Sequence, residues 1–152
     1  MIITISGNPG SGKSTVAKIL VKRLGYERIY AGGILRQIAS EKGIFIEELM
    51  KEAETNTKID EEVDVRVAAE ARKYDQEGKD VIVEGRVQYY FIPESKKVYV
   101  FVDSKAGAER IWKDLQDKEA NAARNQAIAN SVDEVMEKSE GREKAYQLTG
   151  LW

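Results

Sequence analysis

The residues best suited to chemistry lie at the start of the sequence, where a glycine-rich segment holds a lysine and a serine. Residues 7–14 read G-N-P-G-S-G-K-S and match the pattern G-x-x-x-x-G-K-[ST] at every fixed position. Glycines let successive backbone N–H groups curl around a phosphate, and the start of a following helix adds attraction for negative charge. Lys13 can then reach the β- and γ-phosphates of a nucleoside triphosphate, and the Ser14 hydroxyl can hold Mg²⁺.

This segment, the phosphate-binding loop or P-loop, predicts ATP or GTP as the ligand, together with Mg²⁺. Its context supports the motif, because the apolar run at residues 2–5 predicts a buried strand before it and the apolar spacing at residues 16–24 predicts a helix after it. A glycine-rich turn with a solvated lysine is the weaker interpretation. The residues expected to contact the donor nucleotide are Gly7, Asn8, Pro9, Gly10, Ser11, Gly12, Lys13, Ser14 and Thr15.

The remaining apolar pattern predicts an alternation of strands and helices. Further strands are expected at residues 28–30, 80–84 and 98–102, and the last two are continuous apolar runs typical of parallel strands covered on both faces. Apolar periodicity and capping residues predict helices at about residues 34–43, 46–53, 59–77, 104–115 and 132–146. The sequence therefore predicts an α/β fold around a parallel sheet.

Length and composition narrow the possibilities further. A chain of 152 residues suits a single domain, and a net charge of −2 gives no basic field for binding nucleic acid. The chain has no cysteine and no histidine, which excludes disulfides, zinc fingers and Ser-His-Asp triads. With no apolar run of membrane-spanning length and no signal peptide, we expect a cytoplasmic monomer that acts on small molecules.

Two short motifs would favour a GTPase. Residues 57–60 fit [NT]-K-x-D, and residues 75–78 fit D-x-x-G. In a GTPase each motif follows a core strand and D-x-x-G comes first, whereas here the order is reversed and both motifs lie at predicted helix ends. A GTPase is therefore disfavoured.

A small-molecule kinase needs a second anion site for the acceptor, and two arginines are candidates. Arg36 lies on the helix after residues 31–33, and Arg86 follows Glu84 and Gly85 just beyond the end of a predicted strand. Ligands of open α/β sheets bind at that edge, and a guanidinium binds phosphate through two parallel hydrogen bonds. Arg86 is the stronger candidate, since the Arg36 position also suits a solvated helix face.

Together these motifs resemble those of the cytidylate kinases. The similarity lies in G-x-P-G-S-G-K-S, in A-G-x-[IL]-x-R at residues 31–36, in I-D-x-x-V-D at residues 59–64 and in V-E-G-R at residues 83–86. It covers about residues 1–115. The sequence is most similar to the short archaeal and bacterial type within the nucleoside monophosphate kinases. The resemblance implies the P-loop kinase fold, three α/β/α layers with a sheet of four or five parallel strands.

The resemblance also implies an activity, transfer of the ATP γ-phosphoryl group to CMP or dCMP. Lys13, Arg86 and Arg110 would be catalytic, Glu84 would orient Mg²⁺ through water together with Ser14, and residues 34–78 would be the helices that bind the nucleoside monophosphate. A helical lid would occupy about residues 110–142. The implied acceptor-binding residues are Gly32, Arg36, Asp60, Asp64 and Arg86, and the implied lid arginines are Arg110, Arg124 and Arg142.

The sequence departs from the family at three places. Gly33 stands where the family usually has an acidic residue, and Val87 stands where many members have Asp. The C-terminal segment around residues 146–150 does not continue into a further core strand, so the sheet has one strand fewer or the chain is truncated. An adenylate kinase, another small-metabolite kinase, and a non-catalytic ATP-binding module or inactive fragment remain alternatives.

Overall fold

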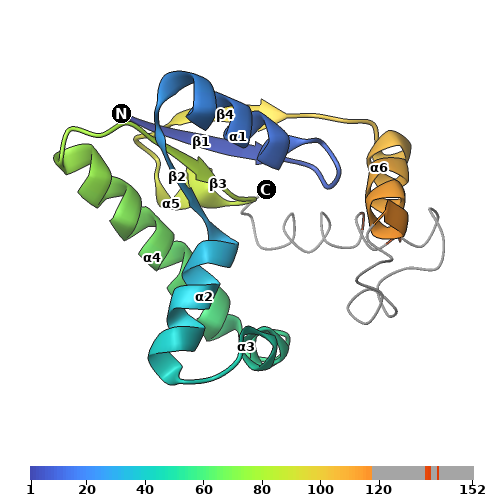
Figure 1. The fold of residues 1–152 in the computed structure, drawn as a ribbon, viewed down its shortest axis with the longest axis horizontal. Helices are drawn as coiled ribbons and strands as arrows, with labels where there is room; N and C mark the ends of the chain where they lie inside the picture. Colours follow the sequence, from blue (N-terminus) through green and yellow to red (C-terminus); the bar gives the residue numbers. More distant parts are fainter. Residues whose placement is uncertain (118–135, 138–139, 141–152) are drawn as a thin grey trace. The chain divides into compact units, whose positions relative to one another are not determined.

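The computed structural model describes residues 1–117, 136–137 and 140, and residues 1–117 form four strands and six helices (Figure 1). The strands make one sheet in the order β2-β3-β1-β4. β3 (Val81–Glu84) lies between β1 (Ile2–Gly7) and β2 (Glu27–Tyr30) and pairs with both in parallel. The predicted α/β fold with a parallel sheet is confirmed, with four strands in the described part of the chain.

The register of the sheet brings three strands to the same level at their carboxyl ends. Ile5 of β1 and Tyr30 of β2 both lie opposite Glu84 of β3. All four residues of β3 are buried, as expected for the apolar centre of a sheet covered on both faces. Residues that follow these strands therefore leave the sheet at one edge, where open α/β sheets bind their ligands.

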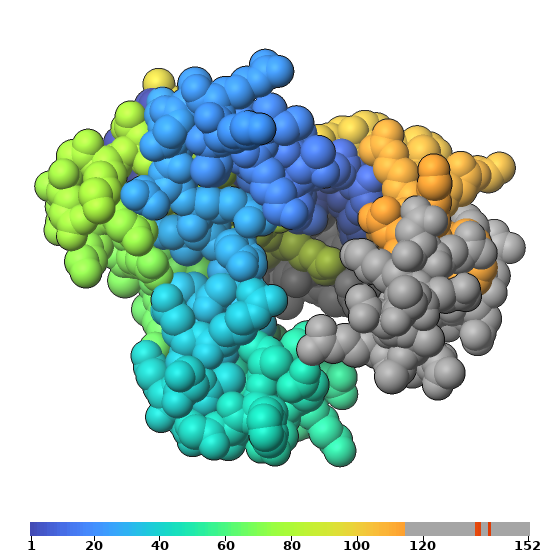
Figure 2. All heavy atoms as spheres, viewed as in Figure 1, coloured from blue at the N-terminus to red at the C-terminus, as the bar shows by residue number. Residues whose placement is uncertain are grey.

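Three helices between β2 and β3 build the main core. They are α2 (Ala31–Lys42), α3 (Ile46–Ala53) and α4 (Thr57–Gln76). Their buried apolar side chains form one cluster with those of β2 and β3, and each such burial contributes about 1.5–3 kcal/mol. Figure 2 shows α2 and α3, coloured cyan to teal, packed against each other. The helix members of the cluster include Ile34, Ile38, Leu49, Ile59, Val63 and Val67.

The predicted helix at residues 46–53 has the bounds of α3, and α4 begins two residues before its predicted start. The earlier start has a local cause, because the Asn56 side chain accepts a hydrogen bond from the backbone N–H of Lys58 at 3.1 Å. An asparagine at this position satisfies one of the N–H groups that the first turn of a helix leaves without a partner.

The prediction for the strand at residues 98–102 is wrong in position and in burial. β4 (Lys96–Val100) starts earlier, and its first four residues are exposed. Phe101, just beyond it, is 76% exposed. β4 lies at one end of the strand order in the described part of the chain, so only one of its edges is paired there. An apolar run alone does not distinguish such an edge strand from a central one.

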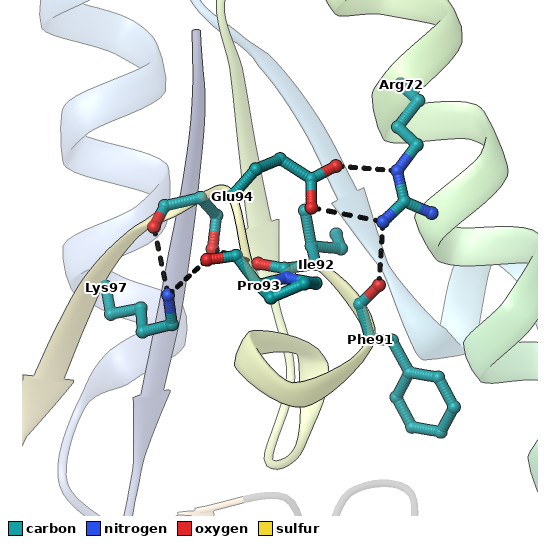
Figure 3. A network of polar contacts seen from close by, with 7 residues as sticks. Arg72, Phe91, Ile92, Pro93, Glu94 and Lys97 are labelled. Carbon is teal, nitrogen blue, oxygen red and sulfur yellow. Dashed lines mark hydrogen bonds and ion pairs between the residues drawn. The ribbon is translucent and has the colours of Figure 1, made fainter.

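A short helix, α5 (Gln88–Phe91), follows β3 and was not predicted. Arg72 of α4 binds the end of α5 and the turn that follows it, as Figure 3 shows. Its Nε and Nη2 donate to the Glu94 carboxylate at 2.6 and 3.1 Å. Its Nη2 also donates to the carbonyl of Phe91 at 2.9 Å. Lys97 Nζ donates to the Pro93 carbonyl at 2.7 Å. The pKa of Glu94 is lowered, chiefly by its hydrogen bonds from Arg72. This network fixes the turn between α5 and β4 against α4.

The remaining helices are α1 (Lys13–Leu24) and α6 (Ser104–Asp117), both close to the predicted ranges. The chain divides into two compact units, one with Met1–Ser6 and Ser14–Val98, the other with Gly7–Lys13 and Tyr99–Trp152. No helix in the described residues is both long enough and apolar enough to cross a membrane.

Candidate active site

Two glycines of the P-loop adopt conformations that other residues rarely take. Gly10 has φ +73° and Gly12 has φ +86°, as the phosphate-binding pattern predicts. Gly7 has no positive φ and is required for another reason: a Cβ there would lie 2.6 Å from Ser11 Oγ and would also collide with the carbonyl oxygen of Val100. The conformational role predicted for Gly7 is thus wrong, and close packing explains this glycine instead.

The side chain of Asn8 holds the P-loop to the segment after β4. Its amide nitrogen donates to the carbonyl of Val102, and its amide oxygen accepts from the backbone N–H of Val102 at 2.9 Å. The residue is only 4% exposed. Because both ends of the side-chain amide are engaged, Asn8 offers a nucleotide its backbone and not its side chain.

Helix α6 packs closely against the P-loop within the same unit. Gly107 approaches so near that a Cβ on it would lie 2.5 Å from the carbonyl oxygen of Pro9, and a Cβ on Gly10 would collide with the Gly107 backbone. Arg110 Nη1 donates to the carbonyl oxygen of Gly10 at 3.3 Å. Arg110, predicted as the first lid arginine, therefore lies beside the loop that is expected to hold the donor phosphates.

Two substitutions distinguish the effect of close packing around a P-loop glycine from the effect of its positive φ alone. Gly10→Ala is expected to lower the free energy of unfolding by about 1–3 kcal/mol, because it adds a collision to a strained φ. Gly12→Ala is the matched control: nothing lies within 4 Å of its Cβ, so we expect about 1–2 kcal/mol from the backbone conformation alone. Urea denaturation measures both. A larger loss in Gly12→Ala than in Gly10→Ala would contradict the observed packing.

In the other unit, Glu84 connects Ser14 with Arg28. The residue Glu84 as a whole is 8% exposed. Its Oε1 accepts a hydrogen bond from Ser14 Oγ, and its Oε2 accepts from Arg28 Nη2 at 2.6 Å and from Arg28 Nε at 3.2 Å. Glu84 and Ser14, both expected to hold Mg²⁺, are thus in direct contact, and their role toward the ion stays a prediction. Arg28 was not predicted, because an arginine inside a four-residue strand has the same sequence signature as a solvated one.

Tyr30 joins Arg28 to Arg36. The Arg28 guanidinium lies over the Tyr30 ring, 4.4 Å from its centroid, and Arg36 Nη1 donates to the Tyr30 hydroxyl at 3.1 Å. A Cβ on Gly32 would come within 3.2 Å of the ring, whereas one on Gly33 would make an ordinary contact at 3.5 Å. Two guanidinium groups therefore gather at the carboxyl end of β2, a suitable arrangement for binding an anion.

Asp64 of α4 is paired with Gln88 of α5. Gln88 Nε2 donates to Asp64 Oδ1 at 2.6 Å, and Gln88 is 2% exposed. A Cβ on Gly85 would lie 2.5 Å from Gln88 Cγ, which explains the glycine of the E-G-R motif. Gln88 Oε1 is buried and, among the described residues, makes no hydrogen bond. The sequence signal for this contact is a polar residue between Val87 and two tyrosines.

Burial raises the pKa of Asp64 to about 6, with a smaller upward effect from Asp60 and an opposing effect of the Gln88 hydrogen bond. Burial also raises the pKa of Asp60. A carboxyl group whose pKa is higher in the folded state stabilises the fold below its unfolded pKa of about 3.9, and this contribution is lost as the pH rises through about 6.

Asp64→Asn removes this titration. The free energy of unfolding of the variant minus that of the wild type should therefore increase by about 1–3 kcal/mol as the pH rises from 4 to 7. Urea denaturation at several pH values measures it, with Glu61→Gln, an exposed carboxylate on the same helix, as the control. A constant difference across this range would contradict the buried environment of Asp64.

Arg86 directly follows Gly85, two residues beyond the end of β3, as the motif predicts. The lid candidates Arg124 and Arg142 lie outside the described residues, as does most of the predicted helix at residues 132–146. Their roles remain predictions.

The donor set at Ser14 and Glu84 fits a magnesium ion. A hydroxyl and a carboxylate are hard oxygen ligands. In the described residues no group of three or more His, Cys, Asp or Glu side chains could hold a metal ion. Mg²⁺ commonly binds through one or two carboxylates, water and substrate phosphates. This pair therefore suits an ion that also binds the phosphates of a nucleotide.

Several known proteins with similar sequences are cytidylate kinases. Residues 3–139 match the family described as AAA domain. The cytidylate kinase of Archaeoglobus fulgidus is 43% identical over 114 residues, which are 74% of this chain and 61% of that protein. The cytidylate kinase of Natronomonas pharaonis is 36% identical over 138 residues, which are 90% of this chain and 69% of that protein. The chain thus spans about 60% of the length of several curated relatives that it matches.

Solved structures agree on the fold. Shikimate kinase from Acinetobacter baumannii, in complex with shikimate, superposes with a TM-score of 0.61 at 19% identity, over 96% of this chain and 75% of that one. Shikimate kinase from Bacteroides thetaiotaomicron has a TM-score of 0.60 at 19% identity, over 97% and 79%. At this identity the likeness shows the three-layer P-loop kinase fold and nothing about the substrate.

Proposed function

This chain belongs to the cytidylate kinase family, and from that premise we propose that it transfers the γ-phosphoryl group of ATP to CMP or dCMP. One observation supports the proposal most strongly. Glu84 accepts a hydrogen bond from Ser14 of the P-loop motif with one carboxylate oxygen and from Arg28 of β2 with the other. A hydroxyl of the P-loop motif and a guanidinium thus bind different oxygens of one carboxylate.

In the proposed reaction an oxygen of the acceptor phosphate attacks the γ-phosphorus of ATP, and the bridging oxygen leaves with ADP. Lys13 and the N–H groups of the P-loop would hold the donor phosphates, and Arg36 and Arg86 would bind the acceptor phosphate. Such a transfer depends on positioning and electrostatics and needs no strong base. The absence of histidine is therefore no obstacle.

Three further assignments complete the proposal. Mg²⁺, held by Ser14 and by Glu84 through water, would neutralise charge on the donor phosphates. Arg110, beside the carbonyl oxygen of Gly10, would act near the transferred group as the first residue of the lid at about residues 110–142.

Helices in residues 34–78 would bind the acceptor, with Gly32, Asp60 and Asp64 on its nucleoside side. We also propose a cytoplasmic monomer, with small molecules as its only substrates.

A panel of acceptors tests the proposal. With ATP and Mg²⁺, we expect turnover with CMP or dCMP to exceed turnover with UMP and AMP, and ADP release without an acceptor to be slow. Highest turnover with AMP would favour an adenylate kinase, the alternative within the same class. ATP binding without turnover of any acceptor would refute the proposal and favour a non-catalytic module.

A further inference from the structure

We propose that Arg28 keeps Glu84 from binding a free divalent cation, so that the metal enters the site only together with the donor nucleotide. The inference rests on the proposed function for the role of Glu84 toward Mg²⁺. Its observations come from one compact unit, the one that holds Ser14–Val98.

Both oxygens of Glu84 already have partners. Ser14 Oγ donates to Oε1, and Arg28 donates to Oε2 from Nη2 at 2.6 Å and from Nε at 3.2 Å. The Glu84 side chain is 9% exposed. A divalent cation that approaches this carboxylate must therefore displace a guanidinium or bind beside it, and the positive charge of Arg28 opposes both.

The surroundings of Arg28 hold it in this position. Its guanidinium lies over the Tyr30 ring, 4.4 Å from the centroid, and its side chain is 21% exposed. Tyr30 and Glu84 are register partners on adjacent strands. An arginine that is stacked on a ring, paired with a carboxylate and partly buried is a much stronger competitor than a solvated one.

A bound nucleotide would change the competition between a divalent cation and Arg28 for the Glu84 carboxylate. Without it, the described residues provide one carboxylate and one hydroxyl, too few ligands to hold Mg²⁺ tightly against a neighbouring cation. Phosphate oxygens on the P-loop would add ligands and negative charge next to Ser14. Arg28 is therefore a positioning residue that couples metal binding to nucleotide binding.

Binding of Mn²⁺ to the nucleotide-free protein, measured by electron paramagnetic resonance, tests this inference without any turnover. Arg28→Met should lower the Kd for Mn²⁺ about tenfold, equivalent to about 1.4 kcal/mol, because the competing charge is gone. Arg28→Gln, a second neutral variant, should behave alike. Arg28→Lys keeps the charge and should bind Mn²⁺ as weakly as the wild type.

Two control variants test whether the added Mn²⁺ binding takes place at Glu84. The double variant Arg28→Met/Glu84→Gln should lose the tighter binding and, with the carboxylate removed, should also recover stability lost by leaving a buried charge unpaired. Arg72→Met breaks the ion pair with Glu94 and should leave Mn²⁺ binding unchanged. Unchanged Mn²⁺ affinity in both neutral variants, or tighter binding that survives Glu84→Gln, would overturn the inference. An inactive wild type would refute only the proposed function, since this assay needs no substrate.

Discussion

Lys13→Met is expected to lower kcat/KM for phosphoryl transfer by about 10²–10³-fold, the usual cost of removing one positioned charge from a transition state. Lys13 is the fixed lysine of the P-loop and the first residue of α1. Methionine keeps the length of the side chain and its helix propensity but removes the ammonium group that the reaction needs. Steady-state kinetics with varied ATP and CMP measure the effect.

Lys18→Met is the matched control. Lys18 is exposed on the same helix, and the substitution is identical. For Lys18→Met we expect kcat/KM within about twofold of the wild type and nearly unchanged stability, because substitutions at exposed helix positions usually alter the free energy of unfolding by less than about 0.5 kcal/mol. Equal losses of activity in the two variants, or none in Lys13→Met, would remove Lys13 from the catalytic site.

Arg86→Ala is expected to reduce kcat/KM for the acceptor by about 10²-fold and to leave ATP binding nearly unchanged, since hydrogen bonds to charged groups contribute about 1.5–3 kcal/mol each. The position of Arg86 just beyond β3, at the carboxyl edge of the sheet, supports a role at the acceptor. Kinetics with varied CMP at saturating ATP give the acceptor term, and calorimetry gives the affinity for ATP.

Arg66→Ala is the control for the loss of an arginine that is not among the proposed acceptor-binding residues. Arg66 lies on α4 and forms ion pairs with Glu41 and Glu62. For Arg66→Ala we expect little change in kcat/KM for CMP or in the affinity for ATP. Equal effects of Arg86→Ala on ATP and on CMP would move Arg86 out of the acceptor site.

The central strands and their helices could be predicted because local and global signals agree there. The apolar run at residues 80–84 became β3, and the amphipathic segment at residues 46–53 has the bounds of α3. The prediction failed for β4, because burial on both faces depends on which helices cover those faces, and the apolar run itself does not carry that information. α5 was missed because four residues are too few to show helical periodicity.

For the candidate site, the sequence predicted which residues belong to a motif but not which side chains meet. Glu84 and Ser14 were both predicted to hold Mg²⁺, which stays a prediction, and their hydrogen bond to each other was not predicted. Arg28 is 56 residues from Glu84 along the chain, and only the parallel register of β2 and β3 brings them together. Gln88 reaches Asp64 through a similar tertiary contact. The roles assigned to Arg36, Arg86 and Arg110 stay predictions.

The fate of the γ-phosphoryl group tests the central claim most directly. The protein would be incubated with ATP labelled with ³²P in the γ position, Mg²⁺ and CMP, and the products separated by chromatography. We predict that the label appears in CDP, in an amount equal to the ADP formed, and that Lys13→Met slows this transfer by about 10²–10³-fold. Label in inorganic phosphate alone, or label retained in ATP with CMP and every other acceptor, would contradict a nucleoside monophosphate kinase.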